Sequence, residues 1–472
     1  MFRSDISKLV VAALILSQVA HSQQDNVKIA IIGGGIGGTS CAYYLNEMFK
    51  EEADIHIYEG SKIGGRLATA TMGDGKEYET GGSIIHERNK YMSDFVRELG
   101  LERRSPPPDA RLGLYNGNAF YFVESDYSFM NIIKMLWRYG FDTIRMQNFV
   151  EKMLDKFDRI YDLQKEGHTF ENVHDLLAAM DPTFPNYLNV TVHDAFVNDE
   201  GLSESIVNEL VQASLRCNYG QTINVHEFVG SVSMAGMSGK LWNVDGGNRR
   251  VPERLLEESK AKRIQDYVIS VVNNQTKYTL STTTASDTYD YVVVATPLSQ
   301  NQRVPLQFNN FPVPIAGLGE YHRTVSTLVV GTLKKSKFPE FSDGSSAIIL
   351  NTDDDDFFNS IGNIQAIDGE MGHNVWKVFS KKPLTDNEIE ELFENHAEVK
   401  VVDWLAYPRY VLPYEARSFT LAPRLYHINA IEWAASAMEM SCIGAKNVAL
   451  LIRQNSGKIE VPPATKGAHM EL

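Results

Sequence analysis

The stretch Val27–Gly38, VKIAIIGGGIGG, decides the fold that this sequence predicts. Its first half, Val27–Ile32, is a short apolar run typical of a buried parallel strand. The second half has the spacing Gly33-x-Gly35-x-x-Gly38, which joins a strand to a helix where a dinucleotide binds. Gly33 allows the tight turn, Gly35 lets the backbone approach a pyrophosphate, and Gly38 lets helix and strand pack closely. The helix that follows directs its N-terminus at the phosphates.

An acidic residue supports this interpretation. Asp54–Glu59, DIHIYE, reads as the second strand of a βαβ unit, and it ends in Glu59 about 20 residues beyond Gly38. A carboxylate at this position accepts hydrogen bonds from a ribose 2′-hydroxyl, which favours FAD or NAD over NADP.

Length and composition set the broad class. The 472 residues exceed one ordinary core, so we expect two sequential or interleaved domains. With 43% hydrophobic and 22% charged residues the chain reads as a soluble globular protein. Its net charge of −15 argues against binding to nucleic acid and against attraction to anionic membranes.

The N-terminus predicts a signal peptide over residues 1–22. Arg3 and Lys8 precede an apolar stretch, Leu9–Leu16, and small residues before Gln23 offer a cleavage site. The alternative is a membrane anchor, but eight apolar residues are too few for a bilayer that needs about 20. We therefore expect a lumenal or secreted protein, with N-glycosylation at Asn189 and Asn274.

The cysteines and histidines predict neither a disulfide framework nor a metal site. Cys41, Cys217 and Cys442 form no CxxC motif, and we expect Cys41 and Cys442 to be buried free thiols. At most one pair forms a disulfide. The twelve histidines show no HExxH or similar ligand spacing.

Two further glycine pairs follow the nucleotide unit. Gly64-Gly65, followed by Arg66, and Gly81-Gly82, followed by Ser83, indicate backbone that again passes close to a ligand, with Arg66 able to bind phosphate through two nitrogens. The alternative is a pair of ordinary hairpin turns. Near the other end, Glu432 precedes a predicted helix, where a carboxylate caps the helix or binds a ribityl chain.

The middle of the chain is predicted from its periodicity. Residues 91–220 are mostly helical in pattern and contain an aromatic-rich stretch, 115–141, that lines either an apolar pocket or the core. Tyr291–Pro297, YVVVATP, reads as a buried parallel strand that returns to the first domain. The acidic run Asp353–Asp356 is expected to be a solvated loop.

Taken in order, these motifs resemble those of the prenylcysteine oxidases. The resemblance covers about Val27 to Leu451, and its more specific segments are VDGGNRRVP, residues 244–252, and NAIEWAASAMEMS, residues 429–441. It implies an α/β fold: a Rossmann-type FAD-binding domain with a parallel sheet and an interleaved α+β substrate domain. FAD binding is expected to be non-covalent, because no cysteine stands just before the NAIE segment.

The resemblance also implies a division into segments and a set of cofactor-binding residues. After the signal peptide, the FAD-binding segments are 23–95, 221–300 and 405–472, and the substrate segments are the helical, aromatic-rich 96–220 and 301–404. The cofactor-binding residues are Gly33, Gly35, Gly38, Glu59, Gly64, Gly65, Arg66, Gly82, Ser83 and Glu432.

The activity implied is that of a lysosomal FAD-dependent thioether oxidase acting on farnesyl- or geranylgeranyl-cysteine with O2 and water. The products are cysteine, a prenyl aldehyde and hydrogen peroxide. Because the cofactor performs the difficult step, no catalytic triad is expected. No catalytic acid or base is identified. His86 is a candidate for activating water, although a structural hydrogen bond is the favoured interpretation.

Two other functions stay open. An amine oxidase uses the same flavin fold, and Trp404, Tyr407, Tyr410 and Tyr414 form a candidate aromatic cage for an amine. A secreted lipid-binding flavoprotein without turnover is the other, because a fold and a cofactor do not prove an activity.

Overall fold

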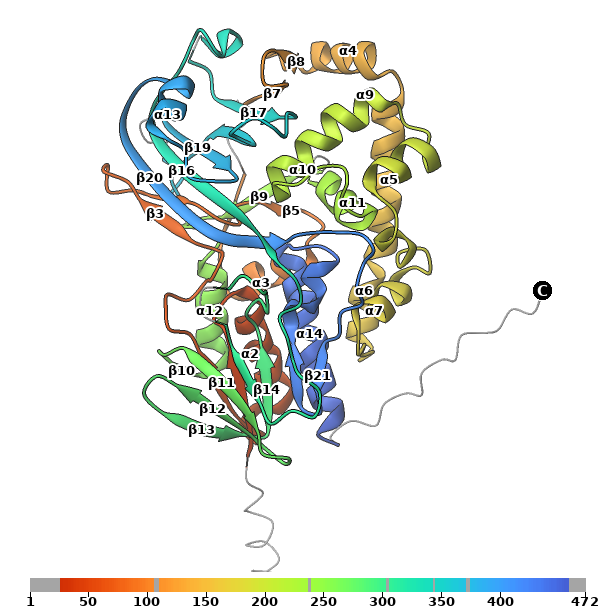
Figure 1. Cartoon of the computed structure of the whole chain (residues 1–472), viewed down its shortest axis with the longest axis vertical. Coiled ribbons are helices and arrows are strands. Elements are labelled where there is room, and N and C mark those ends of the chain that lie inside the picture. The colour runs from red at the N-terminus through yellow and green to blue at the C-terminus, as the bar shows by residue number, and fades with distance from the viewer. Residues whose placement is uncertain are drawn as a thin grey trace, which may run out of the picture.

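A computed structural model describes residues 26–105, 110–236, 239–302, 305–342, 344–370 and 374–457. The predicted signal peptide lies outside these residues. Two large sheets dominate the structure, one at each end of an elongated molecule (Figure 1). No helix in the described ranges is long and apolar enough to cross a membrane.

A six-stranded sheet is built around the predicted first strand. β1 pairs in parallel with β2 and β14, β10 and β22 extend the parallel set, and β21 closes one edge antiparallel to β22. In spatial order the strands are β10 (Lys262–Ile264), β2 (Ala53–Tyr58), β1 (Val27–Ile32), β14 (Tyr291–Val294), β22 (Leu425–His427) and β21 (Thr420–Ala422). The predicted return of the chain through β14 is therefore confirmed, as is the Rossmann-type parallel sheet.

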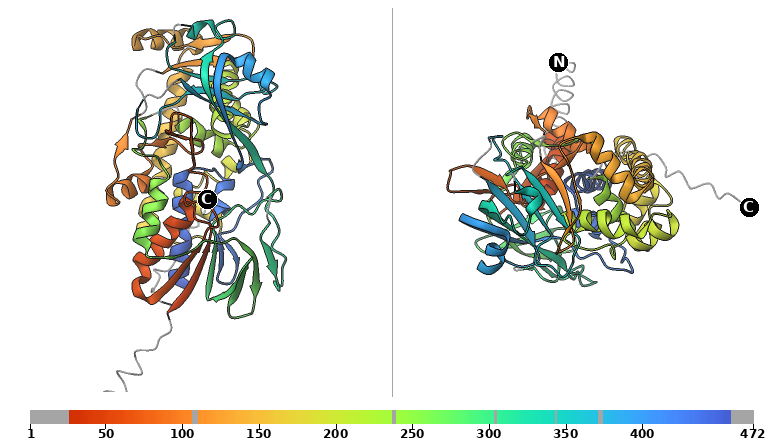
Figure 2. Two further views of the ribbon diagram at one scale, coloured as in Figure 1. Left: turned by 90° about the vertical axis from the view of Figure 1, so that its left-hand side faces the viewer. Right: turned by 90° about the horizontal axis from the view of Figure 1, so that it is seen from above.

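Alternate side chains of β1 enter two different cores, since successive residues of a strand point to opposite faces. Ile29 and Ile31 pack with the helices, whereas Ala30 and Ile32 pack with a smaller sheet. The helical layer is formed by α2 (Ile36–Phe49), which contacts both α12 (Arg250–Ser259) and α14 (Met438–Asn455). The left view of Figure 2 shows red α2 and the green smaller sheet on opposite sides.

The smaller sheet has four strands and covers the second face of the parallel sheet. Its order is β13 (Ser286–Tyr289), β12 (Tyr278–Thr282), β11 (Val268–Asn273) and β15 (Gln307–Asn309). Both faces of the parallel sheet are thus shielded from water, which explains why its strands read as continuous apolar runs.

The second large sheet has seven strands and forms the other end of the molecule. Its order is β20 (Phe393–Pro408), β16 (Tyr321–Leu333), β19 (Val375–Ser380), β18 (Ser360–Asn363), β17 (Ala347–Asn351), β7 (Arg111–Tyr115) and β8 (Phe120–Val123). β7 and β8 lie within the region expected to be mostly helical. Their aromatic and aliphatic residues favour a pleated surface, and pairing with β17 decides the outcome.

A helical layer stands beside the seven-stranded sheet. Its principal helices are α4 (Ser128–Tyr139), α5 (Asp142–Phe157), α6 (Arg159–Lys165), α7 (Val173–Met180), α10 (Gln212–Tyr219) and α11 (Glu227–Ala235). α3 (Lys90–Glu98) instead packs against α14 and α12. Two small sheets connect the units: β3 (Thr69–Thr71) with β4 (Glu77–Glu79), and β5 (Ile85–His86) with β9 (Leu241–Val244) and β6 (Arg103–Arg104). The domain boundaries drawn from the sequence stay predictions.

The aromatic-rich stretch 115–141 does not form one lining. Tyr115, Phe122 and Tyr139 are buried in two separate cores, whereas Phe129 and Trp137 are exposed. The thiols behave as expected: Cys41 and Cys442 are buried and free, and Cys217 is free as well.

Candidate functional site

The glycine-rich turn after β1 is held by two glycines that leave no room for a side chain. Gly33 has φ of +114°, and a Cβ added there would lie 2.7 Å from the carbonyl oxygen of Ala295. A Cβ on Gly38 would lie 2.0 Å from the carbonyl oxygen of Gly33. These contacts fix the turn against the end of β14 and bring α2 close to β1.

Gly35 differs, because it borders open space. Its φ is −77°, which any residue adopts, and an added Cβ would be 3.9 Å from its nearest neighbours in Gly64 and Gly65. No side chain caps the first turn of α2, and that turn holds no acidic residue. The first N–H groups of a helix have no intrahelical partner, so this end of α2 suits a phosphate anion.

The carboxylate of Glu59 joins two loops of the cradle. Its Oε2 accepts the N–H of Gly34 at 2.9 Å, and its Oε1 accepts the N–H of Ser61 at 2.8 Å. The N–H of Gly64 donates to the carbonyl of Gly34 at 2.9 Å. Gly35 and Gly64 also form a parallel bridge, so the second glycine pair lies beside the first.

Arg66 binds Glu432, a residue that comes from the far end of the chain. Both terminal nitrogens of the guanidinium donate to the Glu432 carboxylate, which has no exposed surface. Tyr321 and Asn429 donate to the same carboxylate at 2.8 and 2.7 Å. We expected Arg66 to bind phosphate and Glu432 to cap a helix or bind a ribityl chain. In the structure each side chain binds the other.

The turn that contains Gly82 and Ser83 closes over the same region. The N–H of Gly82 donates to the carbonyl of Arg66 at 3.2 Å, and Asn248 donates to the carbonyl of Gly82 at 3.0 Å. Gly82 is exposed although Ile85, three residues later, is buried. The turn therefore borders accessible space, as a ligand-binding turn requires.

Lys377 of β19 faces this turn, and the sequence analysis did not single it out. Its Nζ lies 3.3 Å from Ser83 Oγ and 3.4 Å from the carbonyl oxygen of Glu79, and the side chain is 8% exposed. Burial lowers the pKa of the Lys377 amine and raises the pKa of the neighbouring Glu79 carboxyl. Only the alternation of β19 signals that Lys377 points inward.

Other polar side chains share the sheet face of Lys377, because residues paired across antiparallel strands point the same way. Leu328 pairs with Lys377, and Ser326 pairs with Phe379, which places Thr324 and Ser326 on this face. The hydroxyls of Thr324 and Ser326 are buried and have no hydrogen-bond partner. Unpaired buried hydroxyls are uncommon, and here they face the region that the predicted cofactor loops surround.

His86 makes a local hydrogen bond, and two of the candidate cage residues pack around Tyr219. His86 Nδ1 accepts the N–H of Arg88 at 3.2 Å, in line with the structural interpretation favoured from the sequence. The rings of Tyr407 and Tyr410 lie 5.2 and 5.6 Å from that of Tyr219, edge to face.

Of the remaining two cage residues, Tyr414 lies near Tyr410, because both contact His226, whereas Trp404 lies apart. Tyr414 packs against His226 with ring centroids 6.0 Å apart. Trp404 belongs to β20, where it pairs with Thr324. Tyr410 and Tyr414 line one cavity of about 260 Å³, together with His226 and Trp433. Trp404 and Tyr407 are not part of its lining, so the four predicted residues do not form one cage.

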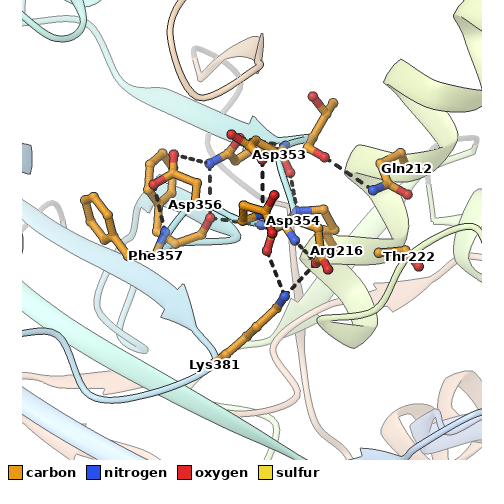
Figure 3. A network of polar contacts seen from close by, with 12 residues as sticks. Gln212, Arg216, Thr222, Asp353, Asp354, Asp356, Phe357 and Lys381 are labelled. Atoms are coloured by element: carbon orange, nitrogen blue, oxygen red, sulfur yellow. Dashed lines mark hydrogen bonds and ion pairs between the residues drawn. The ribbon is translucent and has the colours of Figure 1, made fainter.

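The acidic run beside α10 is anchored, unlike the solvated loop that we expected. Asp354 binds the fully buried guanidinium of Arg216 and lies 2.7 Å from Lys381 Nζ, as Figure 3 shows. Asp356 accepts a hydrogen bond from Asn351 at 2.7 Å. The run borders a cavity of about 760 Å³ with mostly polar walls.

Comparisons with known proteins agree with this geometry. The model of the prenylcysteine lyase family matches residues 122–460, and that of an NAD(P)-binding Rossmann-like domain matches residues 31–99. Prenylcysteine oxidase 1 of Homo sapiens is 42% identical over 449 residues, covering 90% of this chain and 88% of the human protein. Prenylcysteine oxidase 1-like of Bos taurus is 34% identical, covering 94% of each.

Solved structures of more distant sequence share the fold. A putrescine oxidase superposes with a TM-score of 0.60 at 14% identity, covering 91% of this chain and 99% of the other. A fatty acid isomerase from P. acnes gives a TM-score of 0.61 at 13% identity, covering 90% and 99%. The family predicted from the motifs is confirmed by the first two relatives and the family model: this chain belongs to the prenylcysteine lyase family.

Proposed function

We propose that this protein is an FAD-dependent oxidase that cleaves the thioether of farnesyl- or geranylgeranyl-cysteine. One prenylcysteine, one O2 and one water give cysteine, a prenyl aldehyde and hydrogen peroxide. The observation that carries the proposal is the 42% identity to human prenylcysteine oxidase 1 across 90% of the chain. Within that span lies a complete dinucleotide cradle.

The residues of the cradle fit FAD. The uncapped N-terminus of α2 and the open side of Gly35 would hold the pyrophosphate, and Glu59 would hold the adenosine ribose. Gly65 and Gly82 are exposed at turns that lie next to this cradle. FAD, when bound, supplies the electron acceptor for the oxidation. No cysteine stands just before the NAIE segment, which supports non-covalent binding.

The chain itself would position the substrate, exclude water from it and provide polar groups that contact it. Lys377 and the unpaired hydroxyls of Thr324 and Ser326 are donors on a buried sheet face that lies opposite the turn of Gly82. Donors in a dry environment interact more strongly with a ligand oxygen than donors in water. They would orient the polar end of the substrate or a water molecule, while the buried surroundings exclude bulk solvent.

Anaerobic mixing of the flavin-loaded protein with farnesylcysteine tests the proposal. We expect the absorbance of oxidised flavin to bleach, and, when O2 is admitted, peroxide, free cysteine and aldehyde to appear in equal amounts. Bleaching by putrescine but not by farnesylcysteine would establish the amine oxidase alternative. Binding of farnesylcysteine without bleaching would establish a lipid-binding protein that has lost turnover.

We further propose that the chain enters the secretory pathway and acts in the lysosome, with secretion as the alternative destination. The pattern of residues 1–22 supports entry, and both sequon asparagines, Asn189 and Asn274, are exposed. Expression in animal cells should yield a protein whose mass falls on treatment with an N-glycosidase. Asn189→Gln and Asn274→Gln should each remove part of that shift, and microscopy against a lysosomal marker decides the destination.

A further inference from the structure

Helix α4 carries a continuous apolar surface that faces away from the protein. We name it the apolar ridge and define it by the side chains of Phe129, Ile132, Ile133, Leu136, Trp137 and Phe141, all of which are exposed. Trp137 is 87% exposed and Phe129 is 72% exposed. Single exposed apolar residues are ordinary, but a contiguous group of this size marks an interaction site.

The polarity of α4 is the reverse of that of an ordinary surface helix. An amphipathic helix normally turns its apolar side to the core. Here Phe129, Ile133 and Trp137 recur every fourth residue on the outer side. The inner side instead carries the basic residues: Arg138 forms an ion pair with Glu209 at 2.6 Å, and Lys134 donates to the carbonyl of Val123 at 2.9 Å.

These inner contacts give α4 a fixed orientation. The guanidinium of Arg138 is held from two sides, since it also lies over the ring of Tyr121 at 4.9 Å and binds both oxygens of Glu209. Tyr139 adds a hydrogen bond to Glu209 at 2.8 Å and is buried. Because polar contacts hold the inner side, the apolar side cannot turn inward without breaking them.

The position and charge of the ridge fit a lipid surface. α4 stands at the outer edge of the end of the molecule opposite the six-stranded sheet (Figure 1). Residues 124–148 contain three basic and three acidic residues, and Arg138 and Arg145 are paired with Glu209 and Asp142, so this end is close to neutral although the whole chain has a net charge of −15. The local charge therefore does not oppose a phospholipid membrane, contrary to what the total charge suggests.

The dimensions of α4 decide how it would lie. Twelve residues of helix are about 18 Å long, shorter than the hydrocarbon core of about 30 Å. Trp137 and Tyr127 are side chains of the kind that collects at the boundary between lipid headgroups and acyl chains. We propose that the apolar ridge anchors this protein to the surface of a phospholipid bilayer, with α4 in the plane of the interface.

Flotation with vesicles tests the anchor. The probe is the purified full-length protein with vesicles of phosphatidylcholine containing a minor fraction of phosphatidylserine. Phe129→Ser/Trp137→Ser should reduce the vesicle-bound fraction about tenfold or more, because two large apolar side chains lose their lipid contact. Trp137→Phe should retain binding. The matched control is Val313→Ser, which changes an apolar residue that is 73% exposed outside the ridge.

Fluorescence gives an independent measurement. Brominated phosphatidylcholine should quench the emission of the wild-type protein, and much less that of Trp137→Phe. Both substituted side chains are exposed, so unfolding midpoint and flavin content should match the wild type. Equal flotation of the double variant would overturn the proposal. The proposal would also be overturned if the wild-type protein were a dimer that does not bind vesicles, and if the double variant were a monomer. The ridge would then be a contact between two copies of the chain.

Discussion

Both terminal nitrogens of Arg66 bind the carboxylate of Glu432, which is separated from it by 366 positions in the sequence and has no exposed surface. The pair joins the loop after β2 to the segment that precedes α14. The same arginine nitrogen that binds Oε2 also donates to the carbonyl of Ala406 at 2.7 Å. Three distant parts of the chain are therefore fixed against one another beside the predicted cofactor cradle.

Removing one partner of this pair should cost more than removing both. Arg66→Met leaves the buried Glu432 carboxylate without its countercharge, and we expect a loss of about 3–5 kcal/mol in the free energy of unfolding. Arg66→Met/Glu432→Leu removes both charges and should be less destabilised than the sum of the single variants. Urea unfolding of the three variants and the wild type measures the coupling. Additive effects would show that the pair contributes no specific interaction.

The features that could be predicted from the sequence are those that depend on the spacing of residues close together in the chain. The turn after β1, the neighbouring strand β2 and Glu59 at its end belong to one motif of about 30 residues, and each lies where the motif places it. The Arg66–Glu432 pair was not predictable, because nothing in either segment specifies a partner hundreds of residues away. Lys377 was missed because a lysine usually faces solvent, and only the packed sheet shows that the face it shares with its alternate neighbours in β19 is buried.

The role of Gly35 can be separated from that of its neighbours. Gly35→Val should fold, because the φ of −77° suits valine and the nearest atoms lie 3.9 Å from an added Cβ. The larger side chain would occupy the space that we assign to the pyrophosphate, so the purified protein should contain little flavin. Gly35→Ala should lose less of its flavin than Gly35→Val. Flavin absorbance relative to protein measures both, and full flavin content in the valine variant would show that no ligand approaches there.

Glu59→Ala should weaken FAD retention without unfolding the chain. The substitution removes the acceptor for the N–H groups of Gly34 and Ser61, as well as the proposed ribose contact. We expect roughly tenfold to hundredfold weaker binding, which corresponds to about 1–3 kcal/mol. Titration of apoprotein with FAD measures the dissociation constant. Glu51→Ala, at an exposed acid before β2, is the matched control and should leave it unchanged. A dissociation constant for Glu59→Ala equal to that of the wild type would refute the assignment of Glu59 to the ribose.

The stability of the fold should depend on pH through Glu439 in the first turn of α14. The side chain is 2% exposed, and its carboxylate accepts hydrogen bonds from the N–H groups of Tyr91 and Met92 and from the hydroxyl of Tyr161. Burial outweighs these bonds and raises the pKa of Glu439 from 4.5 to about 7. The folded protein therefore binds this proton more tightly than the unfolded chain does.

It follows that the contribution of Glu439 to stability is greatest in acid and is lost as pH rises from about 4.5 to about 7. We expect the free energy of unfolding of the wild type, minus that of Glu439→Gln, to fall by up to about 3 kcal/mol across this range. Burial lowers the pKa values of His226, His322 and His427 to about 4, which destabilises the fold in acid. These histidines are present in both proteins and cancel in the difference. Urea unfolding at a series of pH values measures it, and a difference that does not change with pH would show that Glu439 titrates alike in the folded and unfolded chain.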